Sequence, residues 1–206
     1  MTHAAPTLHV AILAFDGVEA LDLAGPYEVF TTASRMQLRD TPHSPAPFAV
    51  SCVAQEHQPV HARAGMALLP THRFADCPAV DVLVVPGGVV DAALSCAATR
   101  AWIASTHEQA SLTASVCTGA FLLAASGVLR EGPVTTHWED QADLAARYPA
   151  LQVRNGVRWV DLGRIVTAGG ISAGIDMSLH LVARLASETL ALRTATQMEF
   201  QWTRES

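Results

Sequence analysis

The sequence predicts an α/β protein built on a doubly wound, mostly parallel sheet with helices on both faces. Short apolar runs alternate with helix-forming segments along almost all of the 206 residues, an order typical of parallel sheets. The apolar runs are nearly continuous rather than alternating with polar residues, as expected for strands buried on both faces. A chain of this length fits one core, so residues 1–206 are expected to form a single domain.

The expected strands are short and end at glycine, proline or polar residues. The first is the apolar run at residues 8–15, which ends before Asp16 and Gly17. A small hairpin or excursion is expected within residues 57–69. The other strands are predicted at residues 48–54, 80–85, 112–116, 133–135, 153–161 and 164–167, with a turn at Gly163 between the last two.

The expected helices lie between these strands. The first is predicted at residues 18–34 with an interruption at Gly25 and Pro26, because proline fits the first turn of a new helical segment. Residues 40–47 contain three prolines and are expected to form a loop. The remaining helices are predicted at residues 99–110, 118–126, 138–148, 171–187 and 191–201.

Composition excludes several classes of protein. Half of the residues are hydrophobic and 16% are charged, which allows a large core and is unlike a disordered chain. The net charge of −6 and the lack of a basic run argue against nucleic-acid binding. No apolar stretch approaches the roughly 20 residues that span a membrane. The first residues do not resemble a secretory signal, so we expect a cytoplasmic protein with no membrane partner.

Three strand-to-helix junctions are the candidate functional regions. In doubly wound sheets, active sites lie beyond the carboxyl ends of the strands, where the strand order reverses. The junctions with chemically interesting residues are residues 16–22, 86–89 and 116–119.

Cys117 is the candidate nucleophile. It stands between an apolar strand and a small-residue helix, the arrangement of a nucleophile elbow. At the start of a helix, backbone N–H groups and the helix dipole are expected to lower the pKa of the thiol. The alternative is a buried structural cysteine. The other three cysteines, Cys52, Cys77 and Cys96, are expected to be structural. No CxxC pair occurs and a reducing cytosol disfavours disulfides, so no disulfide is expected; a metal site is not expected either.

Gly87 and Gly88 follow the strand predicted at residues 80–85. The amide of Gly88 or Val89, together with that of Cys117 or Thr118, is expected to form an oxyanion pocket. The alternative is an ordinary tight turn.

Two titratable residues are candidate partners of the thiol. Asp22 has apolar neighbours on both sides, so burial would raise its pKa and let it carry a proton. A capping or solvent-facing aspartate is the alternative, and Glu19 is a weaker candidate for the acid. His137 ends a short strand and either reaches the same pocket or is structural. The glycine-rich segment 169–174 lacks the GxGxxG fingerprint, which favours close helix packing over phosphate binding.

Six motifs in order resemble the ThiJ/PfpI superfamily, and within it the isocyanide hydratase branch. The resemblance covers about residues 8–200. The motifs are Leu21-Asp-Leu-Ala-Gly-Pro26, Phe74-Ala-Asp-Cys-Pro78, Val85-Pro-Gly-Gly88, Ser115-Val-Cys-Thr-Gly119, Thr135-Thr-His-Trp138 and Gly169-Gly-Ile-Ser-Ala-Gly-Ile-Asp176.

The resemblance implies a flavodoxin-like sandwich, a homodimer, and no metal or organic cofactor. It implies that Cys117 is the nucleophile and Asp22 the acidic partner that hydrogen-bonds it. Thr118 matches the residue after the nucleophile, which is also threonine in the hydratase branch. Gly88 and its neighbour match the backbone donors of the pocket.

The departures from other branches narrow the expected activity. Thr118 replaces the histidine of family proteases, and Asp22 stands where glyoxalase and deglycase relatives usually have glutamate. The first hypothesis is therefore an isocyanide hydratase acting on a small electrophile. The alternatives are a glyoxalase or deglycase using His137, and a regulatory module whose Cys117 oxidises reversibly.

Overall fold

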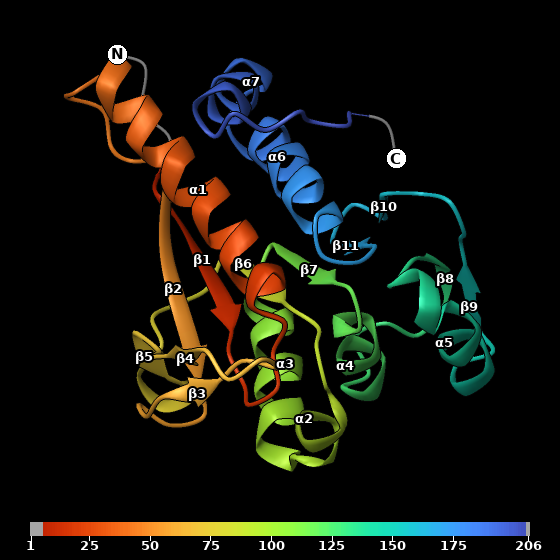
Figure 1. The fold of residues 1–206 in the computed structure, drawn as a ribbon. Helices are drawn as coiled ribbons and strands as arrows, with labels where there is room; N and C mark the ends of the chain where they lie inside the picture. Colours follow the sequence, from red (N-terminus) through yellow and green to blue (C-terminus); the bar gives the residue numbers. More distant parts are fainter. Residues whose placement is uncertain (1–5, 205–206) are drawn as a thin grey trace.

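The computed structural model describes residues 6–204 and contains a seven-stranded sheet (Figure 1). The strand order is β10-β11-β7-β6-β1-β2-β5, and every pair is parallel except β10 with β11. The strands are β1 (Leu8–Leu13), β2 (Phe48–Ala54), β5 (His72–Arg73), β6 (Val82–Val85), β7 (Leu112–Val116), β10 (Trp159–Asp161) and β11 (Ile165–Ala168).

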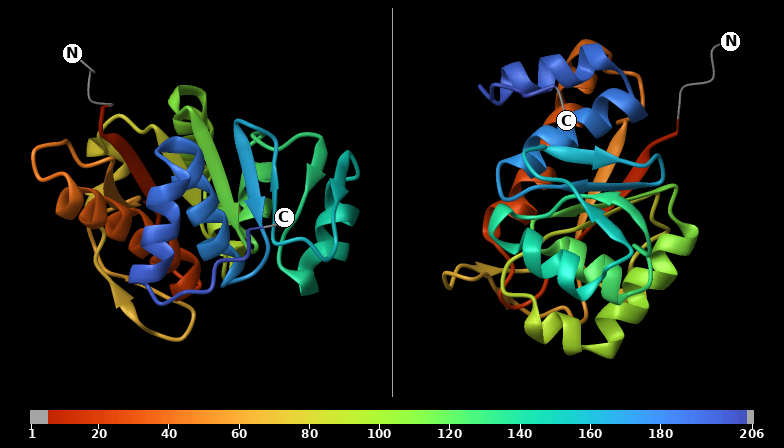
Figure 2. Two further views of the ribbon diagram at one scale, coloured as in Figure 1. Left: turned by 90° about the horizontal axis from the view of Figure 1, so that it is seen from above. Right: turned by 90° about the vertical axis from the view of Figure 1, so that its right-hand side faces the viewer.

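Helices cover both faces of this sheet, as predicted. Figure 2 shows α1, α6 and α7 on one side and α2, α3 and α4 on the other. Every residue of β6 and β7 is buried between them, which explains the continuous apolar runs. The helices are α1 (Ala20–Asp40), α2 (Asp91–Ser95), α3 (Ala97–Gln109), α4 (Gly119–Ala125), α6 (Ala173–Leu185) and α7 (Glu188–Gln197).

Two smaller units stand outside the main sheet. The predicted excursion is a hairpin of β3 (Val60–His61) and β4 (Ala67–Leu68). On the opposite side, α5 (Gln141–Arg147) packs with the parallel pair β8 (Gly132–Val134) and β9 (Leu151–Val153). Short 3-10 turns occur at Phe74–Asp76 and Trp138–Asp140.

The predicted interruption of the first helix is wrong, because α1 runs from Ala20 to Asp40 through Pro26. Proline removes one helical hydrogen bond, but the surrounding packing holds the helix together. Gly25 lets α6 approach closely: a Cβ at that position would lie 2.9 Å from Ile175 Cγ1. The contact between α1 and α6 therefore outweighs the tendency of Gly25 and Pro26 to interrupt the helix.

The single strand predicted at residues 153–161 is also wrong. Its two ends belong to different sheets, β9 in the small pair and β10 at the edge of the main sheet. Residues 154–158 connect them without strand structure. The two-residue strand β5 and the five-residue helix α2 were not predicted, because segments this short carry too little periodicity.

The strand order reverses beside β1, and this reversal positions the functional junctions. The chain passes from β1 to β2 on one side and then crosses to β6 on the other. The parallel strands β1, β6 and β7 therefore end at the same edge of the sheet. Within residues 6–204, no helix combines the length and apolar character needed to cross a bilayer.

Candidate active site

The three predicted junctions meet at this edge of the sheet. Val18 and Gly88 form an isolated antiparallel bridge between the loops after β1 and β6. The Glu19 amide donates to the Gly87 carbonyl at 2.8 Å, and the Val89 amide donates to the Gly17 carbonyl at 2.8 Å. The loop after β7 joins them through Thr118, whose hydroxyl donates to the Gly88 carbonyl and accepts from the Gly88 amide, both at 2.9 Å.

Cys117 occupies the strained turn of a nucleophile elbow. Its φ of 55° lies in the left-handed region, which a non-glycine residue rarely adopts. Its amide donates to the carbonyls of Ala168 and Gly169, and its carbonyl accepts from the Thr136 hydroxyl at 2.7 Å. These bonds from both sides hold the turn in place. A Cβ at Gly119 would lie 2.1 Å from the Val85 carbonyl oxygen, so the turn also requires glycine there.

Asp22 lies in the first turn of α1 and is fully buried. Its Oδ2 accepts from the Gly87 amide at 3.1 Å, and its Oδ1 has no hydrogen-bond partner among the described residues. Burial raises the pKa of Asp22 from 3.8 to about 6, while the Cys117 thiol and the Gly87 amide oppose this rise by stabilising the carboxylate. Asp22 therefore gains and loses a proton close to neutral pH, as its apolar neighbours predicted.

The pKa of the Cys117 thiol is raised to about 12, so the predicted lowering is wrong. Burial is the largest cause and the charge of Asp22 is the second, whereas the Thr118 amide acts in the opposite direction. Cys117 is only 7% exposed, and the favourable end of α4 does not outweigh desolvation beside a carboxylate. In the resting protein the proton is therefore on the sulfur, next to Asp22.

The predicted oxyanion pocket is wrong as well, because most of its amides are already bound. The amides of Gly87, Gly88 and Val89 donate to Asp22, Thr118 and Gly17, and that of Cys117 donates to two carbonyls. The two glycines instead allow close packing. A Cβ at Gly87 would lie 2.5 Å from the Thr118 amide nitrogen, and one at Gly88 would lie 2.2 Å from the Gly17 carbonyl oxygen. The Thr118 amide is directed toward the thiol.

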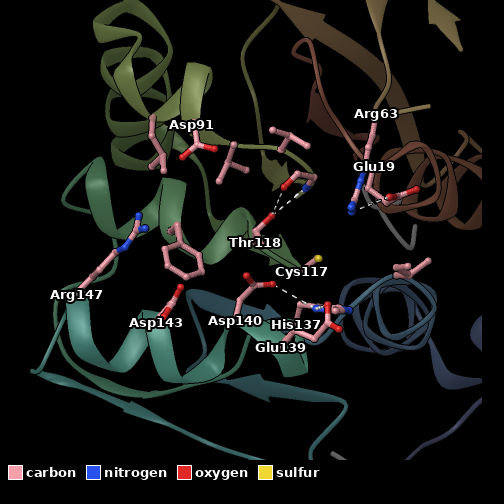
Figure 3. Close-up of a pocket in the computed structure, with 16 residues that line it drawn as sticks. Glu19, Arg63, Asp91, Cys117, Thr118, His137, Glu139, Asp140, Asp143 and Arg147 are labelled. Atoms are coloured by element: carbon pink, nitrogen blue, oxygen red, sulfur yellow. Dashed lines mark hydrogen bonds and ion pairs between the residues drawn. The ribbon is translucent and has the colours of Figure 1, made fainter. Parts of the chain in front are cut away.

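A cavity of about 350 Å³ opens above Cys117 (Figure 3). Cys117, Thr118, Gly88, Val89 and His137 line it, so five of the seven predicted site residues border one space. Asp22 and Gly87 do not line it, although both lie next to Cys117. Glu19, the weaker candidate from the sequence, does line it. The remaining lining residues are Arg63, Val90, Asp91, Leu94, Phe121, Glu139, Asp140, Asp143, Arg147 and Ile171.

His137 reaches this cavity from the segment after β8. Its Nδ1 lies 3.3 Å from the Asp140 carboxylate, and its side chain is 19% exposed. A Cβ at Gly170 would lie 2.1 Å from His137 Cδ2, so the glycine makes room for the ring. The motif at residues 169–174 thus serves close packing at the site, as predicted.

The remaining cysteines differ from Cys117 in their surroundings. Burial raises the pKa of Cys52 and of Cys77 to about 11, and neither lines this cavity. Cys96 lies in a separate cavity across α2. Within residues 6–204, no group of three or more His, Cys, Asp or Glu side chains is arranged to hold a metal ion.

Fold and site together define a class: a flavodoxin-like α/β protein with a cysteine at a nucleophile elbow and a buried carboxyl group behind it. The chain belongs to the DJ-1/PfpI family, which it matches over residues 8–184. It is 36% identical to the isonitrile hydratase of Pseudomonas putida over 194 residues, covering 94% of this chain and 78% of that enzyme.

Other relatives extend the range of proteins that use this domain. The crystal structure of a ThiJ/PfpI family protein from Pseudomonas syringae superposes with a TM-score of 0.83 at 30% identity, covering 97% of this chain and 78% of that one. The HTH-type transcriptional regulator GbdR of Pseudomonas aeruginosa is 26% identical over 85% of this chain. The chain spans only 46% of that regulator's length.

Proposed function

We propose that the protein hydrates isocyanides, R–N≡C, to N-substituted formamides. The observation that carries this proposal is a protonated thiol placed beside a buried carboxyl group that titrates near pH 6. The 36% identity to an isonitrile hydratase over most of both chains supports the same assignment. Such a pair is suited to adding sulfur and hydrogen to the terminal carbon of an isocyanide, because it moves a proton while the sulfur attacks.

The first half-reaction forms a covalent thioimidate. The Asp22 carboxylate takes the proton from the Cys117 thiol as the sulfur bonds to the terminal isocyanide carbon. That carbon then receives the proton from Asp22, which gives R–N=CH–S–Cys117. The high pKa of the free thiol fits this order, because the proton needs to leave only when the substrate is present.

The second half-reaction consumes water. With Asp22 again ionised, a water molecule gives a proton to Asp22 and its hydroxyl adds to the thioimidate carbon. The nitrogen then takes that proton from Asp22, the C–S bond breaks as the C=O bond forms, and the hydroxyl proton returns to the sulfur. The product is R–NH–CHO, so the sum of both halves is the addition of one water to the isocyanide. Glu19 and His137 are among the polar groups that line the cavity where this water would lie.

The hydrogen-bonded amides favour this chemistry over acyl transfer. Attack on a carbonyl places negative charge on oxygen, which enzymes stabilise with free N–H donors. In this site the amides of Gly88 and Val89 are occupied. Attack on an isocyanide instead places charge on carbon, where a proton removes it.

The direct test is to follow cyclohexyl isocyanide and its formamide by chromatography with purified, reduced protein. We expect the formamide concentration to exceed the protein concentration many times. Mass spectrometry of protein quenched during turnover should show the mass of the substrate added at Cys117. If the isocyanide persists while Cys117 remains reduced, the assignment is wrong.

His137 supports a second candidate, a glyoxalase acting on methylglyoxal. Its ring lines the cavity and pairs with Asp140, so it is placed to move a proton near the thiol. Lactate formation from methylglyoxal that disappears in both Cys117→Ala and His137→Ala would favour this activity. Hydration of isocyanides that persists in His137→Ala would favour the first.

A further inference from the structure

The cavity above Cys117 is lined by more negative than positive side chains. Its carboxylates are Glu19, Asp91, Glu139, Asp140 and Asp143, and its guanidinium groups are Arg63 and Arg147. Arg63 lies 3.9 Å from Glu19, so these two charges offset each other at one end. Figure 3 shows Arg147 beside Asp143, away from Cys117, and its guanidinium group lies over the Phe121 ring at 5.5 Å.

The surroundings of Cys117 independently add to this negative field. Asp22 is fully buried beside the Cys117 sulfur, and its Oδ1 has no hydrogen-bond partner among the described residues. The charges of Asp22 and Asp140 both raise the pKa of Cys117. These two carboxylates therefore act on the reacting atom itself, Asp22 from outside the cavity and Asp140 from its lining.

We propose that this cavity selects electrophiles that carry a positively charged substituent, such as an ammonium group, and disfavours those that carry a carboxylate. Where the electrophile is an isocyanide, this inference rests on the proposed function. The reactive carbon would lie at Cys117, and the cation would lie among Asp91, Asp140 and Asp143. A cleft lined by one sign of charge raises the local concentration of the opposite charge.

A bound cation would also assist the chemistry. Burial and then the nearby carboxylates hold the proton on the sulfur, because a thiolate would add poorly solvated negative charge to a negative site. A positive substituent in the same cavity offsets that repulsion. Selectivity is therefore expected in the rate of bond formation at sulfur as well as in binding.

The test measures how fast three methanethiosulfonates of similar size label Cys117. Their headgroups are trimethylammonium, methyl and sulfonate. In each case the thiolate bonds to the sulfenyl sulfur and methanesulfinate leaves, so the chemistry is the same. We expect the cationic reagent to label Cys117 at least about tenfold faster than the anionic one at low salt, and added salt to narrow the ratio.

Cys96 in the neighbouring cavity is the internal reference, with both sites followed by peptide mass spectrometry. It experiences the same net charge of −6 but does not border the cavity above Cys117. The double variant Asp91→Asn/Asp143→Asn should lower the cation preference at Cys117. The exposed pair Glu108→Gln/Glu131→Gln removes the same charge elsewhere and should not. A preference at Cys117 no larger than that at Cys96 would overturn the inference.

Matched isocyanides with ammonium, neutral and carboxylate substituents then separate this inference from the proposed function. If all three are hydrated, we expect kcat/KM to fall in that order. A carboxylate substrate used as well as the ammonium one would contradict the selectivity. If none is hydrated, the proposed function fails, and the labelling ratio alone decides whether the cavity prefers cations.

Discussion

Cys117 and Cys96 each stand at the start of a helix and each line a cavity, yet their surroundings differ in almost every other respect. The short helix α2 separates the two cavities: Asp91 and Leu94 line one, and Ala92 and Ala93 line the other. Cys96 is half-buried, and hydrogen bonds from the Thr99 side chain and backbone lower its pKa. Cys117 is buried beside Asp22, and its pKa is raised to about 12.

The difference shows that a helix start does not by itself define a reactive cysteine. The N–H groups at a helix terminus favour a thiolate, but desolvation and a nearby carboxylate act in the opposite direction. At Cys96 the Thr99 hydroxyl and then the backbone N–H groups lower the pKa, whereas at Cys117 desolvation and then the charge of Asp22 raise it. We propose the catalytic site at Cys117 and not at Cys96, because Asp22 supplies Cys117 with a place for the proton.

The largest expected difference between the two thiols is in turnover. Cys117→Ala should lower isocyanide hydration by about 10³-fold or more, because the covalent intermediate cannot form. Cys96→Ser should change it less than about twofold, which is within ordinary assay scatter. Formamide production under saturating substrate measures both, and far-ultraviolet circular dichroism checks that each variant is folded. Equal losses of hydration activity in the two variants would contradict a special role for Cys117.

Asp22→Asn should lower turnover by about 10²-fold to 10³-fold, since an amide cannot take the proton from the thiol. In the unmodified protein the carboxylate is the active form, so activity should rise with pH through about 6. That inflection should be missing in the Asp22→Asn variant. A pH profile of kcat/KM for both proteins measures this. An inflection near pH 6 that survives the substitution would assign it to another group.

The same substitution should stabilise the fold at alkaline pH. The folded-state pKa of Asp22 is raised above 3.8, so the stability linked to its protonated form is complete below pH 3.8 and is lost as pH rises through about 6. Ionisation thus costs the folded state on the order of 3 kcal/mol above that range. Urea unfolding at pH 5 and pH 8 should show an Asp22→Asn gain that is larger at pH 8. A gain independent of pH would contradict this origin.

The smallest expected effect is in simple alkylation without substrate. Iodoacetamide at pH 7.5 should label Cys96 at least about tenfold faster than Cys117, because only thiolates react. Peptide mass spectrometry over time measures both rates. Asp22→Asn should speed labelling of Cys117, since the substitution removes a charge that holds its proton, while slowing turnover. Faster labelling of Cys117 than of Cys96 in the unmodified protein would contradict the predicted order of reactivity of the two thiols.

Much of this architecture could be predicted from local patterns. Continuous apolar runs identified the buried strands, and the residues after β1, β6 and β7 were expected to meet because parallel strands end at one edge. Asp22 was identified from its apolar neighbours. Apolar neighbours alone could not show that Glu19 lines the cavity while Asp22 is fully buried. They lie three positions apart at one helix start, and only the packing of the Gly87 loop decides which is covered.

The order of residues along the chain determined the α/β fold class, the elbow at Cys117 and the presence of an acid near it, because these depend on local periodicity and on short turns. Only the tertiary structure decided the direction of the thiol's pKa and which amides remain free. Both depend on how deeply the sulfur is buried and on contacts between loops 30 or more residues apart. Desolvation and long-range hydrogen bonding are properties of the assembled site, so no single segment of sequence contains them.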